Sequence, residues 1–345
     1  MKVLVQIHNS GELDLPSQIR VSIGSAIVLG LAKGKLDAEP TTAYLMTYTH
    51  SKCTANCGFC PQARTNSSKA EMLSRVTWPT FTTKNVLRGI AQAVNTDRIG
   101  RVCIQALNYP HVFSHLDALV RTIKQIVDVP VSVSCQPLNS QNLWTLFKAG
   151  VDRIGISLDA ATENIFNNVK GKAAGGSYTW RDEFLLLRVA IGVFGEGNVS
   201  THLIVGLGET EKEATIIVQK CVDMRVLPAL FAFTPVEGTL LSMKPQPRID
   251  VYRRIQLARY LLVNGLARLE DLLFDVYGQI VDFGISKPTL ANLVESGTPF
   301  LTSGCPSCNR PFYNEKPGGV MYNYPRGLRS EEIEEIKSAL KLSRL

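Results

Sequence analysis

The chain has 345 residues, of which 45% are hydrophobic, and its formal net charge is +7. This composition is typical of a globular protein, and no apolar run reaches the ~18 residues of a spanning helix, so we expect no membrane segment. The basic residues are dispersed, which argues against a nucleic-acid partner but would attract an acidic protein. Residues 1–16 lack the apolar core of a signal peptide, so we expect a cytoplasmic protein whose eight cysteines bind metal or act in catalysis.

Along the chain, a helical pattern over 17–31 comes first and predicts an N-terminal cap over residues 1–40. From about residue 40, short β-rich runs alternate with amphipathic stretches, which predicts repeated βα units and a parallel sheet or barrel. The predicted strands are 43–48, 101–106, 131–134, 153–158, 200–205 and 229–233. The predicted helices between them are 83–94, 114–127, 139–149, 181–193 and 210–224.

After residue 233 the alternation weakens. A helix over 248–264, one or two strands within 271–283 and a short helix over 288–296 are expected there. The length suits an α/β fold of the (βα)8 TIM-barrel type, either complete or as a partial six-unit barrel with a C-terminal extension, and the complete barrel is favoured. We therefore expect a barrel over residues 41–303 and a short tail over 304–345.

Three cysteines, Cys53, Cys57 and Cys60, form a Cys-x3-Cys-x2-Cys run after the first predicted strand. The same spacing could place packing residues on one face of a helix, but Gly58 and Pro61 break helices and favour a loop. A zinc site fits poorly, because no fourth His or Cys is near. Three thiolates from one loop can hold three irons of a 4Fe-4S cluster and leave the fourth iron open to a small molecule.

The run Cys53-Thr-Ala-Asn-Cys57-Gly-Phe59-Cys60 resembles the signature of the radical S-adenosylmethionine (SAM) enzymes, in which an aromatic residue precedes the last cysteine. The resemblance implies that the amine and carboxylate of SAM chelate the open iron. It also implies that one electron from the cluster cleaves SAM to a 5′-deoxyadenosyl radical, which abstracts hydrogen from an unactivated C–H bond. The three cysteines would then be the catalytic, iron-binding residues.

The resemblance to biotin synthase and its relatives implies further residues of the cofactor pocket. The segment 204–210, Ile-Val-Gly-Leu-Gly-Glu-Thr, resembles their adenine-contacting turn. Ser157 and Asp159, at the end of the fourth predicted strand, resemble the groups placed on the ribose hydroxyls, and Arg181 resembles the arginine that binds the SAM carboxylate. By residue type alone, Asp159 is also a helix cap and Arg181 a surface residue. The implied cofactor contacts are Phe59, Ser157, Asp159, Arg181, Ile204, Gly206 and Leu207.

Four more cysteines indicate a second iron–sulfur site. Cys103 and Cys135 lie on the second and third predicted strands, which in biotin synthase donate cysteines to an auxiliary cluster that is consumed as the sulfur source. Ser200 stands where that enzyme has a further cysteine, but Cys305-Pro-Ser-Cys308 would complete four ligands for a second 4Fe-4S cluster. A zinc knuckle and a metal-free turn are alternatives for this pair. The remaining Cys221 is expected to pack in the core.

The segment 305–315 is similar to the tails of the two-component lipoyl synthases of archaea and some bacteria. This implies sulfur insertion into a protein-bound octanoyl chain to form lipoyl, with SAM, two 4Fe-4S clusters and a sacrificed sulfide. The implied partners are an octanoylated lipoyl-carrier domain or glycine cleavage H-type protein, a sister lipoyl synthase subunit and a ferredoxin- or flavodoxin-type electron donor. The alternatives are sulfur insertion into dethiobiotin, another radical SAM reaction, and a non-catalytic iron–sulfur electron-transfer or scaffold protein.

Overall fold

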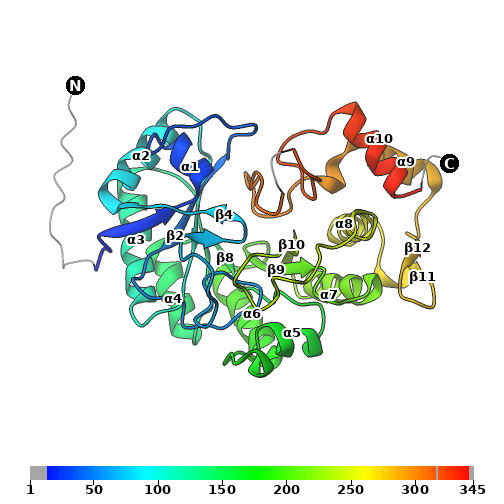
Figure 1. The fold of residues 1–345 in the computed structure, drawn as a ribbon, viewed down its shortest axis with the longest axis horizontal. Helices are drawn as coiled ribbons and strands as arrows, with labels where there is room; N and C mark the ends of the chain where they lie inside the picture. The colour runs from blue at the N-terminus through cyan, green and yellow to red at the C-terminus, as the bar shows by residue number, and fades with distance from the viewer. Residues whose placement is uncertain (1–13, 316–317, 342–345) are drawn as a thin grey trace.

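The computed structural model describes residues 14–315 and 318–341, and its central feature is an eight-stranded, mostly parallel sheet (Figure 1). The strand order is β10-β9-β8-β7-β6-β2-β1-β5, and the neighbours from β10 to β2 pair in parallel. The parallel strands are β2 (Thr42–Thr47), β6 (Arg101–Gln105), β7 (Val131–Ser134), β8 (Arg153–Gly155), β9 (Val199–Val205) and β10 (Leu227–Ala232).

The six predicted strands are confirmed, and the fold is the partial form of the predicted barrel. The complete barrel that the length favoured is not formed in the described residues, where β10 pairs only with β9 and the sheet stays open. The reason lies after residue 233, where the chain forms a helix and an antiparallel hairpin instead of two more βα units. These elements are α8 (Ile249–Val263), β11 (Leu273–Phe274), β12 (Ile280–Asp282) and α9 (Lys287–Ser296).

Helices connect the parallel strands and pack on one face of the sheet. Several begin at a threonine whose hydroxyl accepts a hydrogen bond from the first turn, and at Thr210 a reciprocal bond from Thr210 N to the Glu213 carboxylate completes a capping box. None of the helices in the described ranges is long and apolar enough to cross a membrane. The connecting helices are α2 (Thr83–Asn95), α3 (Val112–Ile126), α4 (Ser140–Ala149), α5 (Glu163–Val169), α6 (Trp180–Phe194) and α7 (Glu211–Asp223), with short 3-10 turns at Lys172–Ala174, Leu269–Asp271 and Thr298–Phe300.

The predicted helix over 17–31 is wrong. Residues Gln18–Val21 form strand β1, which pairs antiparallel with β2 and with β5 (Thr80–Thr82), and only Ile23–Val28 form a short helix, α1. The β-branched Ile19 and Val21 are buried against the core, where they cover the edge of β2. A short hairpin of β3 (Met72–Leu73) and β4 (Val76–Thr77) lies between β2 and β5 in the chain.

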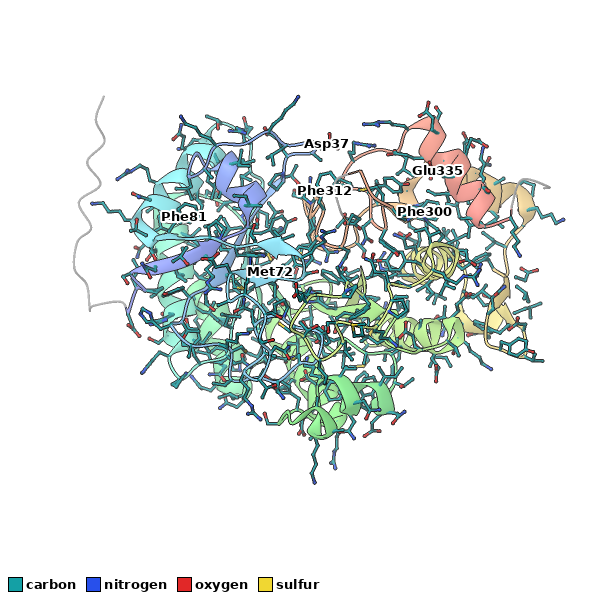
Figure 2. All side chains as sticks on the ribbon, in the orientation of Figure 1. Asp37, Met72, Phe81, Phe300, Phe312 and Glu335 are labelled. Carbon is teal, nitrogen blue, oxygen red and sulfur yellow. The ribbon has the colours of Figure 1, made fainter. Side chains whose placement is uncertain are left out.

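The C-terminal segment returns from the α8 side to the start of the sheet (Figure 1). Phe300 is completely buried beside α8, where the Arg253 guanidinium stands 5.6 Å from its ring centre (Figure 2). Beyond it, Thr41 Oγ1 and Thr42 Oγ1 both donate hydrogen bonds to Ser307 O, at 2.7 and 2.6 Å. The tail therefore docks where β2 begins, and it ends in helix α10 (Ser330–Ala339).

Side chains alternate between two environments along the parallel strands. One face packs against the helices as the apolar core, with Ala43, Leu45, Val102, Ile104, Val131, Val133, Leu203 and Val205. The other face lines an interior cavity, with Tyr44, Met46, Cys103, Gln105, Ser132, Ser134, Ser200 and His202. This alternation decides which predicted site residues reach the interior.

Candidate functional site

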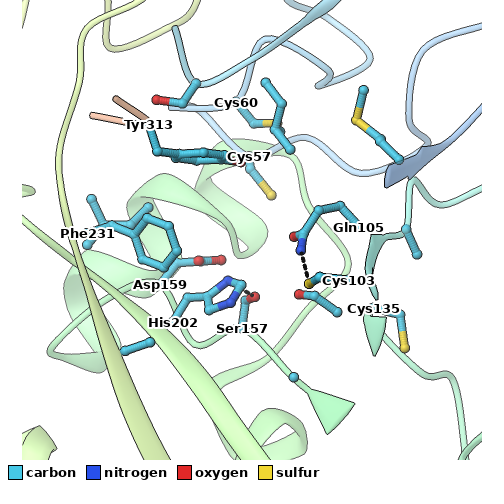
Figure 3. Close-up of a pocket in the computed structure, with 18 of the residues that line it drawn as sticks. Cys57, Cys60, Cys103, Gln105, Cys135, Ser157, Asp159, His202, Phe231 and Tyr313 are labelled. Atoms are coloured by element: carbon cyan, nitrogen blue, oxygen red, sulfur yellow. Dashed lines mark hydrogen bonds between the residues drawn. The ribbon is translucent and has the colours of Figure 1, made fainter. Parts of the chain in front are cut away.

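A cavity of ≈ 260 Å³ occupies the interior enclosed by the sheet (Figure 3). Seven of the eight cysteines contribute to its wall, and the eighth, Cys221, is buried in the apolar core as predicted. We call Cys53, Cys57 and Cys60 the N-terminal trio. The other four cysteines of the wall are Cys103, Cys135, Cys305 and Cys308.

The trio lies in a loop directly after β2 and adopts no helix, which confirms the prediction of a loop. Lys52 Nζ donates hydrogen bonds to three backbone carbonyls of residues 61–68, including Pro61 O at 3.1 Å and Ser68 O at 2.8 Å. Gly58 N donates to Val169 O at 2.7 Å, which ties the loop to the end of α5. The loop is thus shaped by contacts of the protein itself.

Two thiols of the trio stand in a desolvated environment. Desolvation raises the pKa of Cys60 to about 12 and raises the pKa of Cys57 well above its usual value, although the charge of Lys170 lowers the pKa of Cys57. Cys53 Sγ accepts a hydrogen bond from Asn108 N at 3.2 Å. Desolvated thiolates are costly without a cation, so Cys57 and Cys60 fit an iron cluster whose binding displaces their protons, with Cys53 beside them in the same loop.

A buried charge cluster lies next to the trio, at the end of β8. Asp159, whose φ of +65° is in the left-handed region, accepts a hydrogen bond from Lys170 Nζ at 2.9 Å, and Glu183 Oε1 lies 3.9 Å from the same nitrogen. Burial raises the pKa of Glu183 to about 7, although Lys170 opposes the rise. Burial lowers the pKa of Lys170, but the two carboxylates outweigh it and raise this pKa above its usual value. Asp159 and Ser157, the residues predicted to bind the ribose hydroxyls, both line the cavity.

Lys170 is a candidate that the sequence reasoning missed. Its side chain is only 1% exposed, it lines the cavity, and its charge acts on the Cys57 thiol. The predicted carboxylate partner, Arg181, is exposed in the first turn of α6 and is not part of the cavity wall, so the geometry does not support its predicted role. One nearby residue could have drawn attention to Lys170. A Cβ at Gly176 would lie 2.0 Å from Lys170 O, so the backbone passes too close to this lysine for any residue except glycine.

The glycine-rich turn after β9 is held by its own glutamate. The Glu209 carboxylate accepts hydrogen bonds from three successive backbone N–H groups of the turn, at 2.5 to 3.1 Å. Ile204, a predicted adenine contact, and Phe59, a predicted cofactor contact, line the cavity. Leu207 packs with them in a small apolar cluster, and Gly206 is not among the residues of the wall.

A second set of thiols gathers near the start of the strands. Tyr44, Cys103 and Ser132 stand side by side on β2, β6 and β7, and the turn 305–308 of the tail packs against them. Desolvation raises the pKa of Cys103, and the neighbouring Cys305 and Cys308 raise it further. We call Cys103, Cys305 and Cys308 the second thiol group.

Cys135 does not join this group. The alternation of β7 turns the side chains of Ser132 and Ser134 into the cavity, whereas Cys135, which follows β7 and borders the cavity wall, packs its side chain in the apolar core. Figure 3 shows its sulfur directed away from Cys103. The geometry therefore does not support the prediction of Cys135 as a fourth ligand. In the described part of the chain, no three His, Cys, Asp or Glu side chains are grouped as they would be around a single metal ion.

Two further side chains of the cavity wall are His202 and Tyr313. His202 Nδ1 lies 2.9 Å from Ser157 Oγ, and burial lowers the pKa of His202 to about 4, so the ring is neutral at physiological pH. Burial raises the pKa of Tyr313, a tail residue, and both Cys60 and Cys103 raise it further, which places its phenol between the trio and the second group. Neither residue has a sequence motif, because the tail meets β9 only in the folded chain.

Comparisons with known proteins bear on the barrel and the trio. A family model described as the Radical SAM superfamily matches residues 47–221, just over half of the chain, which include the trio and the glycine-rich turn but not the tail. No curated protein matches the chain. Methylornithine synthase (PylB) has a TM-score of 0.51 at 12% identity over 64% of this chain and 62% of its own. HydG, a maturase of the [FeFe]-hydrogenase, has a TM-score of 0.52 at 13% identity over 86% of this chain and 68% of its own. This chain thus spans less than two thirds of the methylornithine synthase, and at such identities the likeness shows the fold alone.

Proposed function

The chain belongs to the radical SAM superfamily, and from that premise we propose that it inserts sulfur into an unactivated C–H bond of a protein-bound octanoyl chain to form lipoyl. When bound, a cluster on the trio would supply the electron that cleaves SAM to the 5′-deoxyadenosyl radical, and a cluster on the second thiol group would supply the sulfide and accept the one electron released as the C–S bond forms. The observation that carries the proposal is that two separate groups of three thiols face one cavity.

The residues around the trio would bind SAM. The trio would hold three irons of the first cluster, and the desolvated cation of Lys170, beside Cys57, would pair with the SAM carboxylate in place of Arg181. Asp159 would accept hydrogen bonds from the ribose hydroxyls, because its carboxylate lines the cavity beside that cation. The apolar surface of Ile204 would lie against the adenine.

The second thiol group would hold the cluster that gives up sulfide. Arg101, Arg153 and Arg310 surround this end of the cavity, and within residues 14–315 and 318–341 none of them forms an ion pair with a carboxylate. Their positive charge is therefore free to offset the negative charge of three thiolates. Zinc offers no sulfide, so iron is the metal that this function requires.

The cavity wall supports an alkyl substrate. Apolar side chains from β2, the β3–β4 hairpin, the segment before β5 and the end of β10 line it, and they would bury a hydrocarbon chain favourably. They are Met46, Leu73, Trp78, Phe231 and Phe233. With a net charge of +7, the protein would attract an acidic octanoylated lipoyl-carrier domain or H-type protein. A sister subunit and a ferredoxin- or flavodoxin-type donor complete the proposed partners.

Anaerobic reconstitution tests this function. We expect about eight irons per chain instead of the roughly four of a single cluster, release of 5′-deoxyadenosine, and thiolation of an octanoyl-lysine peptide. Cys57→Ala should abolish deoxyadenosine formation, whereas Cys308→Ala should spare uncoupled cleavage of SAM and stop sulfur transfer. About four irons, with no thiolated product, would refute the proposal.

One observation favours sulfur insertion into dethiobiotin as a second candidate. The side of the cavity formed by β7, β8 and β9 is polar, with Ser134, Ser157 and the neutral His202 facing the interior. Such groups would bind a substrate that carries a ureido ring near the reacting carbon. Product analysis with dethiobiotin in parallel with octanoyl-lysine peptide separates the two candidates.

A further inference from the structure

Each sulfur of the second thiol group is paired with one hydrogen-bond donor from the barrel. The donors come from β2, β6 and β7, three neighbouring strands of the sheet. The pairs are Gln105 Nε2 with Cys103 Sγ at 3.2 Å, Ser132 Oγ with Cys305 Sγ at 3.5 Å and the Tyr44 hydroxyl with Cys308 Sγ at 3.5 Å. Figure 3 shows the first of these bonds within the cavity.

Arginines orient two of the three donors. Arg310 N donates to the Tyr44 hydroxyl oxygen at 2.8 Å, so the phenol's own hydrogen remains for Cys308 Sγ. Arg101 Nη1 donates to Ser132 Oγ at 3.0 Å, which leaves the Ser132 hydrogen for the other tail thiol. A backbone N–H and a guanidinium can only donate, so neither uses a hydroxyl hydrogen, and a thiolate sulfur bound to metal can only accept; both hydroxyls would then donate to sulfur.

The backbone of the tail is shaped to make these contacts. Arg101 Nε also donates to Pro306 O at 2.9 Å, so one guanidinium fixes both Ser132 and the turn. Ser307 and Arg310 adopt φ values of +65° and +35°, which are unfavourable for residues other than glycine. Such strain persists where the surrounding contacts enforce it, and here it brings Arg310 N to Tyr44.

The charges around the two thiol sets differ. Beside the trio, the Lys170 ammonium is balanced by Asp159 at 2.9 Å, and Glu183 adds a second carboxylate at 3.9 Å. At the second group, Arg101 and Arg310 donate to the Ser132 and Tyr44 hydroxyls, and within residues 14–315 and 318–341 neither arginine forms an ion pair with a carboxylate. The second site is therefore the more electropositive of the two.

We propose that the Tyr44 and Ser132 hydroxyls, held by Arg310 and Arg101, are positioning residues that raise the reduction potential of a cluster on the second thiol group above that of the SAM-binding cluster. Hydrogen bonds to the ligating sulfurs and nearby positive charge stabilise the reduced state of an iron–sulfur cluster. The electron that the second cluster takes up during C–S bond formation would then stay there. This inference rests on the proposed function, because it requires the second cluster.

The test is an anaerobic redox titration of the reconstituted full chain, with dithionite as reductant and electron paramagnetic resonance as the readout. The SAM-binding cluster is identified as the signal that changes when SAM is added. In the wild type the other signal should develop at the higher potential. Tyr44→Phe removes the hydrogen-bond donor and keeps the ring. At the midpoint potential of the wild type, this variant should have a ratio of reduced to oxidised second cluster about tenfold lower, equivalent to a reduction potential lower by about 59 mV. Ser132→Ala should shift the potential in the same direction.

Matched variants control for general effects on the protein. Tyr109→Phe removes a phenol that bonds His115 at 2.9 Å, and Ser296→Ala removes a hydroxyl that bonds Leu293 O at 2.7 Å at the end of α9, so neither should move the second signal. If Tyr44→Phe fails to retain its second cluster, the potential of the second cluster in Ser132→Ala tests the proposal.

The possible failures are distinguishable by iron content. Eight irons per chain with unshifted potentials in the Tyr44 and Ser132 variants, or a wild-type second cluster at the lower potential, would overturn this inference and leave the proposed function intact. About four irons in the wild type would overturn the proposed function itself and this inference with it.

Discussion

Replacing Glu183 with glutamine should stabilise the protein above pH 7. The Glu183 side chain is 2% exposed, and its Oε2 has no hydrogen-bond partner among the described residues. Its Oε1 is 3.9 Å from Lys170 Nζ, which lies nearer to Asp159, at 2.9 Å. Because Asp159 already balances the lysine, the ionised Glu183 is a second carboxylate on one ammonium, and its charge is poorly compensated.

The magnitude follows from the pKa of Glu183, which burial raises from 4.5 to about 7. Each pKa unit corresponds to about 1.4 kcal/mol, so ionising Glu183 in the folded state costs about 3 kcal/mol. Between these two pKa values the folded protein holds a proton that the unfolded chain has released. The free energy of unfolding therefore falls as the pH rises through this window, and the loss is complete above the folded pKa. Glutamine has no charge to ionise and removes this fall.

Anaerobic urea denaturation of the reconstituted protein at pH 5 and pH 8 measures the effect. From pH 5 to pH 8, the free energy of unfolding of the wild type should fall by about 2 to 3 kcal/mol more than that of Glu183→Gln. Glu163→Gln, which changes an exposed acid on the neighbouring helix α5, is the matched control and should follow the wild type. An equal loss in wild type and Glu183→Gln would mean that the fold tolerates the Glu183 anion, which contradicts the reasoning.

Three further changes test the site. Lys170→Met should weaken SAM binding at least about tenfold in calorimetric titration because it removes the buried cation, whereas Arg181→Ala should have little effect; equal weakening would restore Arg181 as the carboxylate partner. Cys103→Ala should halve the iron content of the reconstituted protein and Cys135→Ala should not, and a colorimetric iron assay distinguishes them. Lys52→Met leaves three backbone carbonyls of residues 61–68, in the loop that contains the trio, without their donor. Urea denaturation should then show a free energy of unfolding lower by about 2 to 4 kcal/mol, and an unchanged value would mean that water replaces the ammonium.

The correct placement of Cys135 was accessible from the sequence. Residues 131–135 read Val-Ser-Val-Ser-Cys, and a strand with period two sets both serines on one face and Cys135 on the face of the valines. The same rule puts Cys103 and Gln105 on one face of β6, where the structure has them. If cysteines are assigned to the cluster because they lie on a strand, without regard to the face of the sheet, Cys135 is included as a ligand although its side chain packs in the core.

Other features depend on contacts between distant segments and were beyond local patterns. The six parallel strands and their helices each carry their own periodicity, so they were predictable. Strand β1 was not predictable. The spacing of Ile19 and Val21 fits a helix poorly but does not decide between helix and strand, and their pairing with β2 forms only in the fold. Lys170 likewise looks like any other lysine until Asp159 and Glu183 surround it.

The open sheet explains how one chain can place two thiol sets in a single cavity. Tyr44, level with Cys103, lies three residues before the end of β2 at Thr47, which corresponds to about 10 Å of strand. The trio follows the end of that strand, so the proposed substrate carbon would lie between the two sets. A sheet closed by eight parallel strands would fill the gap with further strands. Because β10 and β5 stay apart in the described fold, the tail can enter the interior and bring Arg310 and Tyr313 to the cavity. The partial barrel is thus the condition for the second metal site that we propose, which the C-terminal segment would complete.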